Sequence, residues 1–349
     1  MTKKSFFARA FVATNALIIL GLTLGCDSSS RSPSSSLSSV SDNDPSGITP
    51  GPGAEKGICT TLNFSGFSWP NNLFEFEKEA LQLGLNITGT FEGRDGWENL
   101  TNDFDAQGMS MGLMNQNLGT GSLQPLLVIM RDQHFAKFRS LFQPDHFQSI
   151  LAMLSNWEST KAFSTTAEVD FSPLDINNNE DGQANESTSG SVEWARKTLY
   201  DSPGVFNPIW KKELKSLASS TEYVGLQINA AWDLHQRALR LHRFMAVYEL
   251  RTYLLMFDIV VQNGNLKPQD EIEYRDFVSK NPRATATQRL QKIVDLRLRW
   301  VKPQFRKDVQ SRKMSLIHGS GLVHGRNRQY EKEYCFNRRQ SFPRRSVLP

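Results

Sequence analysis

Two carboxylates in the first third of the chain could perform acid–base chemistry. Glu92 ends a mainly apolar segment that begins at Ile87, and it stands where the chain enters a glycine-rich region. Burial against Phe91 and Trp97 would raise the pKa of this carboxyl, so that it would keep its proton near neutral pH. Asp105 follows farther along the same region. A carboxyl pair that faces across a gap can hydrolyse a glycosidic bond, one member acting as acid and the other as base.

Three short runs around these carboxylates keep a fixed order. They read Ile-Thr-Gly-Thr-Phe-Glu at 87–92, Asp-Ala-Gln-Gly-Met-Ser-Met-Gly-Leu-Met at 105–114 and Gly-Thr-Gly-Ser at 119–122. This strip, within residues 87–126, resembles the active-site strip of bacterial chitosanases, the inverting members of the lysozyme superfamily. The run Gly-Leu-Met-x-Gln at 112–116 is also similar to a strand of goose-type lysozymes and lytic transglycosylases.

The resemblance implies a role for three residues. Glu92 would be the general acid, Asp105 would be the base that draws a proton from water, and Ser110 would help to hold that water. An inverting pair needs room for the water, so we expect the two carboxyls about 6.5–9.5 Å apart. The resemblance implies no cofactor.

Two departures from the chitosanase pattern leave alternatives open. The interval between Glu92 and Asp105 is shorter than in that family, so the base could instead be Asp103 or Glu98. Ser122 stands where the family has an aspartate that pairs with the ammonium group of the substrate. We therefore expect an amino-sugar polymer as the partner, either peptidoglycan, whether or not it is partly de-N-acetylated, or chitosan. The expected substrate contacts are Asp103, Gln107, Asn115, Gln116 and Ser122.

Two other functions fit the same sequence. A lytic transglycosylase needs only the acid and makes an anhydro-sugar end, so a base at Asp105 argues against it. A non-catalytic lipoprotein that binds peptidoglycan could use a lysozyme-like scaffold, because a fold does not guarantee an activity.

The first 26 residues are typical of an export signal. Lys3, Lys4 and Arg9 precede an apolar stretch, 10–24, and Cys26 follows a small glycine, as in a bacterial lipobox. This pattern predicts cleavage and lipidation at Cys26, and hence a membrane-anchored lipoprotein that is periplasmic or on the outer membrane or cell surface. A plain signal peptide or an uncleaved anchor helix are the alternatives.

Composition divides the rest of the chain. Residues 27–55 are rich in Ser, Pro and Gly and predict a disordered stalk, 56–336 a single lysozyme-like catalytic domain, and 337–349 a basic disordered tail. Export permits Cys59 and Cys335 to pair and so to join the two ends of the domain; two free buried thiols are the alternative.

Charge and histidine content exclude other partners. The formal net charge is +4 in 349 residues, and basic residues are mixed with acidic ones, so we expect no nucleic-acid partner. The polar segment 175–191 reads as a surface loop whose acids lack the spacing of a calcium loop. His318 and His324 lack accompanying ligands, so no metal site is predicted.

Apolar spacing predicts a mainly α (α+β) protein, and the resemblance adds a lysozyme-like or chitosanase-like helical fold with a small β-hairpin sheet lining the active-site cleft. Residues 93–121 suit turns and short strands. In a later run, Phe257 to Gly264, we expect Asp258 to bond to an arginine or the backbone, with substrate contact as the alternative. Helices are expected at 73–83, at 123–154 with an interruption at Pro144, and at 192–199, 207–217, 222–261, 284–299 and 303–317.

Overall fold

The structure is a computed structural model that describes residues 59–65, 67, 69–70, 73–93, 95–164 and 187–343. For Glu92, Asn263 and residues 161–164 it describes the backbone alone. The predicted signal segment with Cys26 and the predicted stalk lie outside the described residues, as does most of the loop predicted at 175–191.

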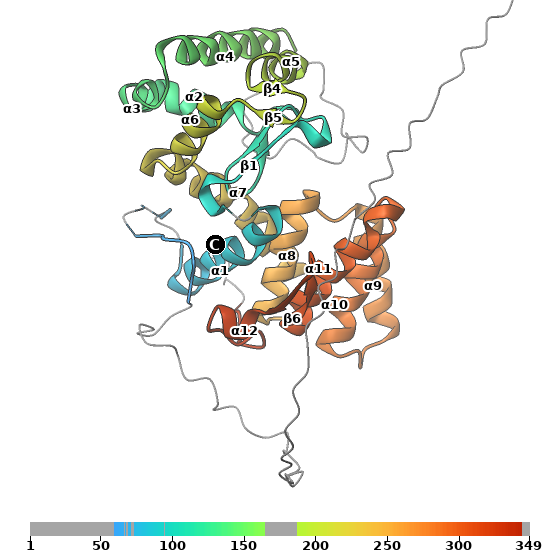
Figure 1. The fold of residues 1–349 in the computed structure, drawn as a ribbon. Helices are drawn as coiled ribbons and strands as arrows, with labels where there is room; N and C mark the ends of the chain where they lie inside the picture. Colours follow the sequence, from blue (N-terminus) through green and yellow to red (C-terminus); the bar gives the residue numbers. More distant parts are fainter. Residues whose placement is uncertain are drawn as a thin grey trace, which may run out of the picture. The chain divides into compact units, whose positions relative to one another are not determined.

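The described chain is mainly helical with small antiparallel sheets, which confirms the predicted class at that level (Figure 1). The helices are α1 (Glu75–Glu92), α2 (Gln124–Gln133), α3 (Phe135–Ser140), α4 (Pro144–Ser164), α5 (Ser189–Thr198), α6 (Pro208–Ala218), α7 (Thr221–Met245), α8 (Leu250–Asn263), α9 (Pro268–Lys280), α10 (Ala286–Leu298), α11 (Arg306–His318) and α12 (Tyr330–Glu333). The strands are β1 (Leu100–Thr101), β2 (Ser110–Met111), β3 (Gln116–Asn117), β4 (Tyr200–Ser202), β5 (Val205–Phe206), β6 (Ser320–Val323) and β7 (Arg326–Gln329), and the 3₁₀ turns are η1 (Gly96–Glu98), η2 (Asp103–Asp105) and η4 (Pro303–Phe305).

Helix α1 continues beyond the end that its sequence predicts. The prediction that it ends near Gly84 is wrong, because α1 runs on to Glu92. A Cβ at Gly84 would lie 3.0 Å from the Phe257 ring, so the glycine allows α8 to approach closely. This contact offsets the cost of a glycine inside a helix, which is about 1 kcal/mol.

The long helical run predicted at 222–261 is two helices. Helix α7 begins at the side chain of Ser220, which accepts a hydrogen bond from the Tyr223 N–H. It ends where Ala246 adopts a left-handed conformation, φ 51°, and α8 starts after a short connection. Prediction of one continuous helix is therefore wrong, because the chain turns at a residue that carries no sequence signal for a break.

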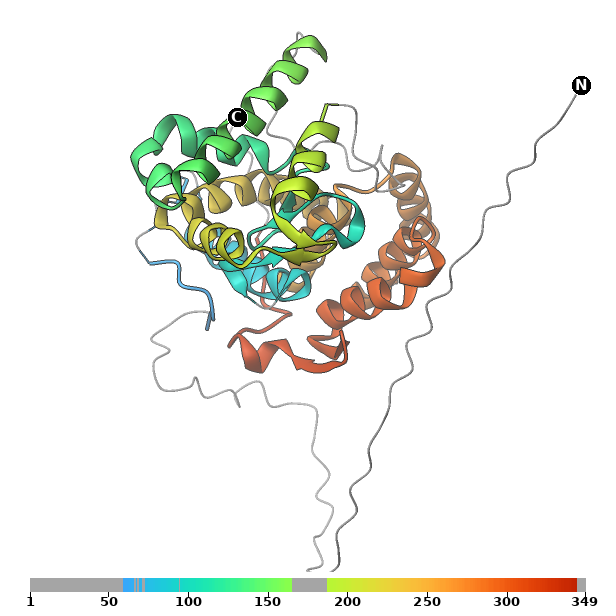
Figure 2. The same ribbon diagram turned by 45° about the horizontal axis from the view of Figure 1, so that its top comes forward.

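Two hydrophobic cores share helix α7. The first core contains side chains from α1, from α8 to α12 and from the C-terminal half of α7. The second core contains side chains from β2, from α2 to α6 and from the start of α7. Figure 2 shows the C-terminal helices, in orange and red, grouped apart from the green helices α2 to α4. Helix α7 thus joins two lobes, one around each core.

A three-stranded antiparallel sheet follows α1, in the order β1–β2–β3. Thr101 pairs with Ser110, which pairs with Asn117. The short strands and turns expected in residues 93–121 are confirmed. Two hairpins that were not predicted, β4–β5 and β6–β7, lie farther along the chain.

The two ends of the folded unit are joined. Cys59 and Cys335 form the predicted disulfide, and the Cys59 N–H donates to the Tyr334 carbonyl, 3.1 Å. Beyond it, residues 337–343 are folded, so the disordered tail predicted at 337–349 does not begin at residue 337; residues 344–349 lie outside the described part. Residues 337–343 pack along the start of α8, where Phe342 is buried and the Leu250 N–H donates to the Gln340 carbonyl. Burial of Phe342 explains the order of this segment.

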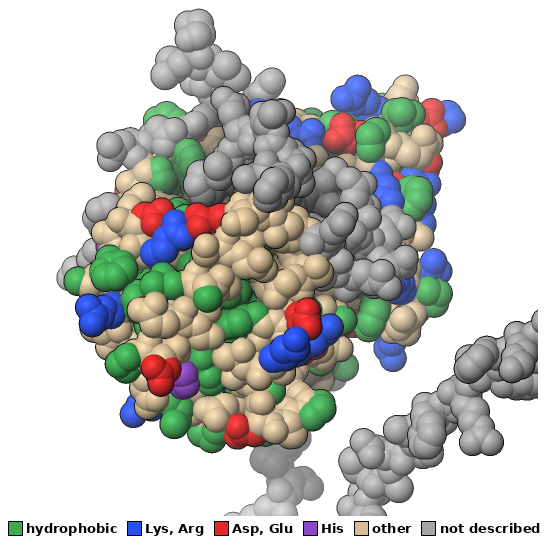
Figure 3. All heavy atoms as spheres, turned by 90° about the horizontal axis from the view of Figure 1, so that it is seen from above, with side chains coloured by type: hydrophobic (Ala, Val, Ile, Leu, Met, Phe, Trp, Pro, Cys, Tyr) green, Lys and Arg blue, Asp and Glu red, His purple; other side chains and the backbone are tan. Residues whose placement is uncertain are grey.

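The surface carries mixed charge. On the face in Figure 3, acidic and basic side chains are interspersed and neither sign forms a continuous field. In the part of the chain that is described, no helix combines the length and apolar character needed to cross a membrane.

Candidate functional site

The site begins where α1 ends and the chain turns toward the sheet. Glu92 is the last residue of α1, and its side chain lies outside the described part of the structure. One turn earlier, Gly89 faces the turn between β2 and β3, because a Cβ there would lie 2.4 Å from a methyl carbon of Leu113. The absence of a side chain at Gly89 lets the sheet pack directly against the last turns of the helix.

Asp105 lies in the loop between β1 and β2, at the end of η2. Much of its surface is open to solvent, and no residue in the described ranges forms an ion pair with it. Packing on its remaining sides raises the pKa of this carboxyl above 3.8, and the charge of Asp103 adds to the rise. A hydrogen bond from the Gln107 N–H to the carboxylate, 3.2 Å, opposes this rise in pKa. The Asp105 carboxyl is therefore accessible from solvent, and its pKa is raised.

Asp103, the alternative base, is already bound on both oxygens. Its Oδ2 accepts from Arg196 Nε at 2.5 Å, and its Oδ1 accepts from the Gly108 N–H at 2.6 Å. Both carboxylate oxygens of Asp103 are thus already occupied as hydrogen-bond acceptors. The geometry therefore favours Asp105 over Asp103 for proton abstraction.

The second lobe fastens this loop. Besides the Arg196 pair, Asn102 Nδ2 donates to the Gly204 carbonyl at 2.7 Å, and the Tyr200 hydroxyl donates to the Gly108 carbonyl at 2.6 Å. These partners come from α5 and the β4–β5 hairpin, roughly a hundred residues farther along the chain. The loop that carries Asp105 is held in place from outside the sheet.

Ser110 and Asn115 belong to the sheet itself. Ser110 is buried in the central strand β2. No hydrogen bond joins its hydroxyl to Asp105 within the described residues, so a shared water would have to lie between them. The Asn115 side-chain oxygen accepts from Asn99 Nδ2 at 2.7 Å, which ties the β2–β3 turn to the start of β1.

Three of the predicted substrate contacts are built into the protein. Gln107 is buried and packs against Gly119. A Cβ on Gly119 would lie 2.2 Å from the side-chain oxygen of Gln107. Gln116 is buried in β3. The Ser122 hydroxyl accepts from the Asn117 N–H at 3.0 Å inside the turn after β3. Burial favours a structural role for Gln107 and Gln116, and its hydrogen bond within the turn favours one for Ser122.

A buried charge cluster supports the end of α1 from the first lobe. The Arg312 guanidinium lies over the Phe91 ring at 4.4 Å, next to Glu92 in the chain. Arg312 and Lys313 both bond to Asp258, at 2.7 and 2.9 Å. The prediction that Asp258 bonds to an arginine is therefore confirmed.

The pKa values in this cluster follow from its pairing. Burial alone would raise the pKa of Asp258, but the two cations more than offset it and hold the pKa below 3.8. Burial lowers the pKa of Lys313 to about 8, against the opposing pull of Asp258. Neither Arg312 nor Lys313 was predicted as part of the site, because the contact spans more than fifty residues of sequence.

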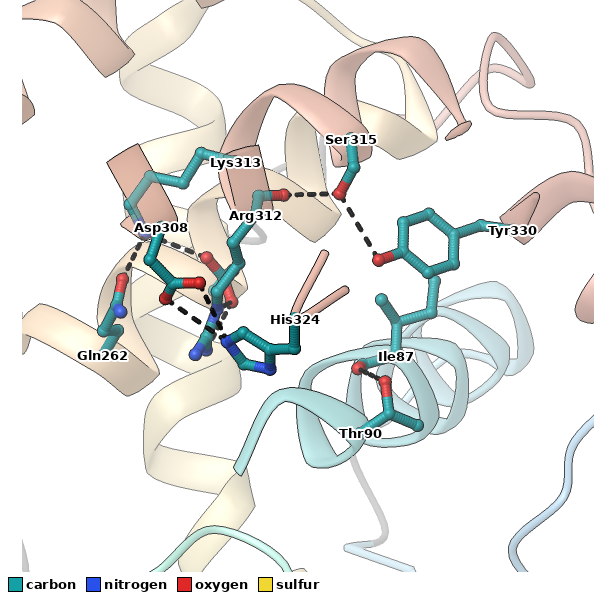
Figure 4. Close-up of polar contacts among 10 residues, drawn as sticks. Ile87, Thr90, Gln262, Asp308, Arg312, Lys313, Ser315, His324 and Tyr330 are labelled. Atoms are coloured by element: carbon teal, nitrogen blue, oxygen red, sulfur yellow. Dashed lines mark hydrogen bonds and ion pairs between the residues drawn. The ribbon is translucent and has the colours of Figure 1, made fainter. Parts of the chain in front are cut away.

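Beside this cluster, the β6–β7 turn approaches α1. His324 pairs with Asp308 of α11 at 3.2 Å, and its ring meets the Phe91 ring edge to face, with centroids 6.4 Å apart. Figure 4 shows His324 over the last turn of α1. No group of three or more His, Cys, Asp or Glu residues in the described ranges could hold a metal ion.

A pocket of about 380 Å³ lies beside the C-terminal half of α1 and includes Gly89 and Leu113 in its lining. It is lined by the segment after Cys59, by the C-terminal half of α1 and by η1 with Trp97 and Glu98. Glu98, the third candidate for the base, is exposed at this pocket, whereas Asp105 does not line it.

Comparisons with protein-family models, with curated protein sequences and with solved structures give no match for this chain.

Proposed function

We propose that this protein is a glycoside hydrolase that cuts β-1,4 bonds in an amino-sugar polymer by an inverting acid–base mechanism. The proposal rests on three structural features that follow one another along the chain. Helix α1 ends at Glu92, the chain passes directly into a three-stranded sheet, and the first loop of that sheet holds Asp105 without an ion-pair partner in the described ranges. This is the order of parts that the chitosanase-like strip implies.

In the proposed reaction, Glu92 donates its proton to the glycosidic oxygen as the bond to the anomeric carbon breaks. Asp105 takes a proton from a water molecule, whose oxygen forms the new bond to that carbon from the opposite face. The products are one sugar with a reducing end of inverted configuration and one with a new hydroxyl. The raised pKa of Asp105 suits a base that must accept a proton during the reaction.

The environment of α1 suits the acid role. Phe91 is buried beside Arg312, and the α1 helix is packed on the Asp258 cluster and on the β2–β3 turn. A proton donor must stay aligned with the scissile bond, and this packing would hold the last turns of α1 in place.

The substrate we propose is peptidoglycan, with or without partial de-N-acetylation, or else chitosan. Ser122 is neutral and bonded within its own turn, so it offers no charge to an ammonium group. Export and a lipid anchor at Cys26 would bring the enzyme to the cell wall, and both are proposals from the sequence alone.

Product analysis by mass spectrometry tests the proposal. The full chain is incubated with chitosan, native peptidoglycan and de-N-acetylated peptidoglycan, beside Glu92→Gln and the control Glu75→Gln, which changes an exposed glutamate at the start of the same helix. We expect reducing-end fragments from the wild type and from Glu75→Gln, and at least a thousandfold less from Glu92→Gln. Anhydro-sugar ends would instead indicate a lytic transglycosylase, and binding without any fragment would indicate a wall-binding protein.

A further inference from the structure

The proposed reaction assigns no role to the pocket beside the C-terminal half of α1. Its volume, about 380 Å³, lies within the range of about 300–1,000 Å³ that small-molecule sites occupy. Thr90 and Gly93, which line it, stand two residues before and one residue after Glu92 in the chain. A molecule in this pocket would therefore lie against the last turn of the helix that carries the proposed acid.

The walls of this pocket are held in place by contacts within the protein. The buried side-chain oxygen of Asn86, on α1, accepts from the Thr61 N–H at 2.9 Å and from the Leu62 N–H at 3.0 Å. On the η1 side, the Trp97 ring meets the Phe64 ring edge to face, with centroids 5.8 Å apart. Because these walls are already ordered, a ligand that enters the pocket loses little free energy to arranging them.

The described lining of the pocket is acidic. It contains two carboxylates, Asp95 and Glu98, and no lysine, arginine or histidine. Asp95 already pairs with Lys215, with 2.5 Å between Oδ2 and Nζ. Glu98 is exposed at the pocket, and no residue in the described ranges forms an ion pair with it. A cation that enters the pocket can therefore pair with the Glu98 carboxylate.

The surroundings of Glu98 suit an ammonium group. Trp97 precedes Glu98 in η1 and lines the same pocket, and a tryptophan ring attracts a cation. An ammonium group has three N–H donors and no acceptor. It can therefore pair with the Glu98 carboxylate and still donate to neutral oxygens of the lining.

Hydroxyl side chains supply such neutral oxygens. Three lining residues carry hydroxyls that already donate within the protein: Thr61, Thr90 and Ser219. A hydroxyl oxygen that donates its proton keeps lone pairs for another donor, so these oxygens can accept from a ligand that carries hydroxyls besides its ammonium. An amino sugar without its acetyl group has this chemistry, whereas a lysine side chain has the ammonium alone and an N-acetylated sugar has no charge.

We propose that this pocket binds a de-N-acetylated amino sugar of the polymer, with Glu98 as the counter-ion of its ammonium and Trp97 as the wall beside it. The inference rests on the proposed function, because the sugar belongs to the chain that Glu92 would cut. It adds the acetylation state of one sugar and assigns Glu98 to binding. The charge that Ser122 does not offer to an ammonium group comes from Glu98.

Isothermal titration calorimetry at low salt tests the pocket. The full-length Glu92→Gln variant is the background, so that no bond is cut, and the probes are the β-1,4 hexamers of glucosamine and of N-acetylglucosamine. In this background we expect Glu98→Gln to raise the Kd of the glucosamine hexamer about tenfold and to change that of the acetylated hexamer less than about twofold. Glu98→Asp keeps the charge and should keep most of the preference. Glu75→Gln, which changes an exposed glutamate at the other end of α1, is the control and should change neither Kd.

The outcomes separate this inference from the proposed function. Equal affinity for the two hexamers would overturn the ammonium site, and a preference for glucosamine that survives Glu98→Gln would overturn its assignment to this pocket. Displacement of the glucosamine hexamer by lysine amide would overturn the choice of a sugar as the ligand. Each of these results leaves the hydrolase standing if the wild type releases fragments, whereas a wild type that neither cuts nor binds any glycan would overturn both. Circular dichroism shows that each variant is folded.

Discussion

Asp258 and Asp105 lie in regions that shift the pKa of a carboxylate in opposite directions. Asp258, in the first lobe, is fully buried and bonded to two cations, which keep it ionised despite the loss of water. Asp105 lies at the surface of the sheet loop without a counter-ion among the described residues, and its pKa is raised. A paired carboxylate fixes the fold, whereas an unpaired one remains able to change its protonation. The variants below test this division, from the largest expected effect to the smallest.

Asp258→Asn should destabilise the protein most. It leaves the buried Arg312 and Lys313 without their anion, and such a loss costs about 3–5 kcal/mol. The measurement is the free energy of unfolding from urea titration at pH 7. Asp276→Asn, which breaks an exposed pair with Lys280, is the control and should cost less than about 1 kcal/mol. Equal losses in the two variants would contradict the structural role of Asp258.

His242 should have the next largest effect, because it is a buried ionisable group and no acidic residue in the described ranges forms an ion pair with it. Burial first, and then Arg243, lower its pKa from 6.5 to about 4. The unfolded chain takes up this proton below pH 6.5 and the folded protein does not, so stability is present above pH 6.5 and falls as the pH drops toward 4. From the two pKa values the loss is about 3 kcal/mol.

Replacement of His242 by Leu should remove that loss. Urea unfolding at pH 7, 5.5 and 4 would measure the slope in the wild type, in His242→Leu and in the control His318→Leu, which changes an exposed histidine. A wild-type slope that persists in His242→Leu would assign the acid sensitivity to another group.

Arg196→Ala should have a small effect on stability and a distinct one on activity. The Arg196–Asp103 pair is partly exposed, so its loss should cost less than about 1 kcal/mol. The charge of Asp103 would then act on Asp105 without compensation and raise the pKa of Asp105 further.

If Asp105 is the base, it must be ionised to act, so the acid limb of the kcat/KM profile should move to higher pH in Arg196→Ala. Lys197→Ala, which breaks an exposed pair on the same helix, is the control. An acid limb that stays in place would mean that another group sets it.

Local sequence patterns predicted the helices and the short sheet well, but not their ends. Gly84 reads as a helix end, and only its contact with Phe257 explains why the helix continues. The break at Ala246 has no glycine or proline to signal it. Helix α9 was not predicted, since only two of its side chains, Asp270 and Tyr274, are buried and one of these is charged.

Only the part of the candidate site whose residues lie close together in the sequence was predictable. The strip around Glu92 and Asp105 lies within forty residues, so its order could be read along the chain. Arg196 and Arg312 contact Asp103 and Asp258 from 93 and 54 residues away. Such contacts depend on how distant helices pack together, and no local sequence pattern predicts them.

The bond between Cys59 and Cys335 closes a covalent ring around nearly all of the described chain. A protease that cuts the backbone once between these two residues opens the ring without releasing a fragment. The two pieces stay covalently linked by the disulfide. They therefore meet at the high effective concentration of an intramolecular contact. A protein outside the cell could thus be nicked once and still present both lobes together until the disulfide is reduced.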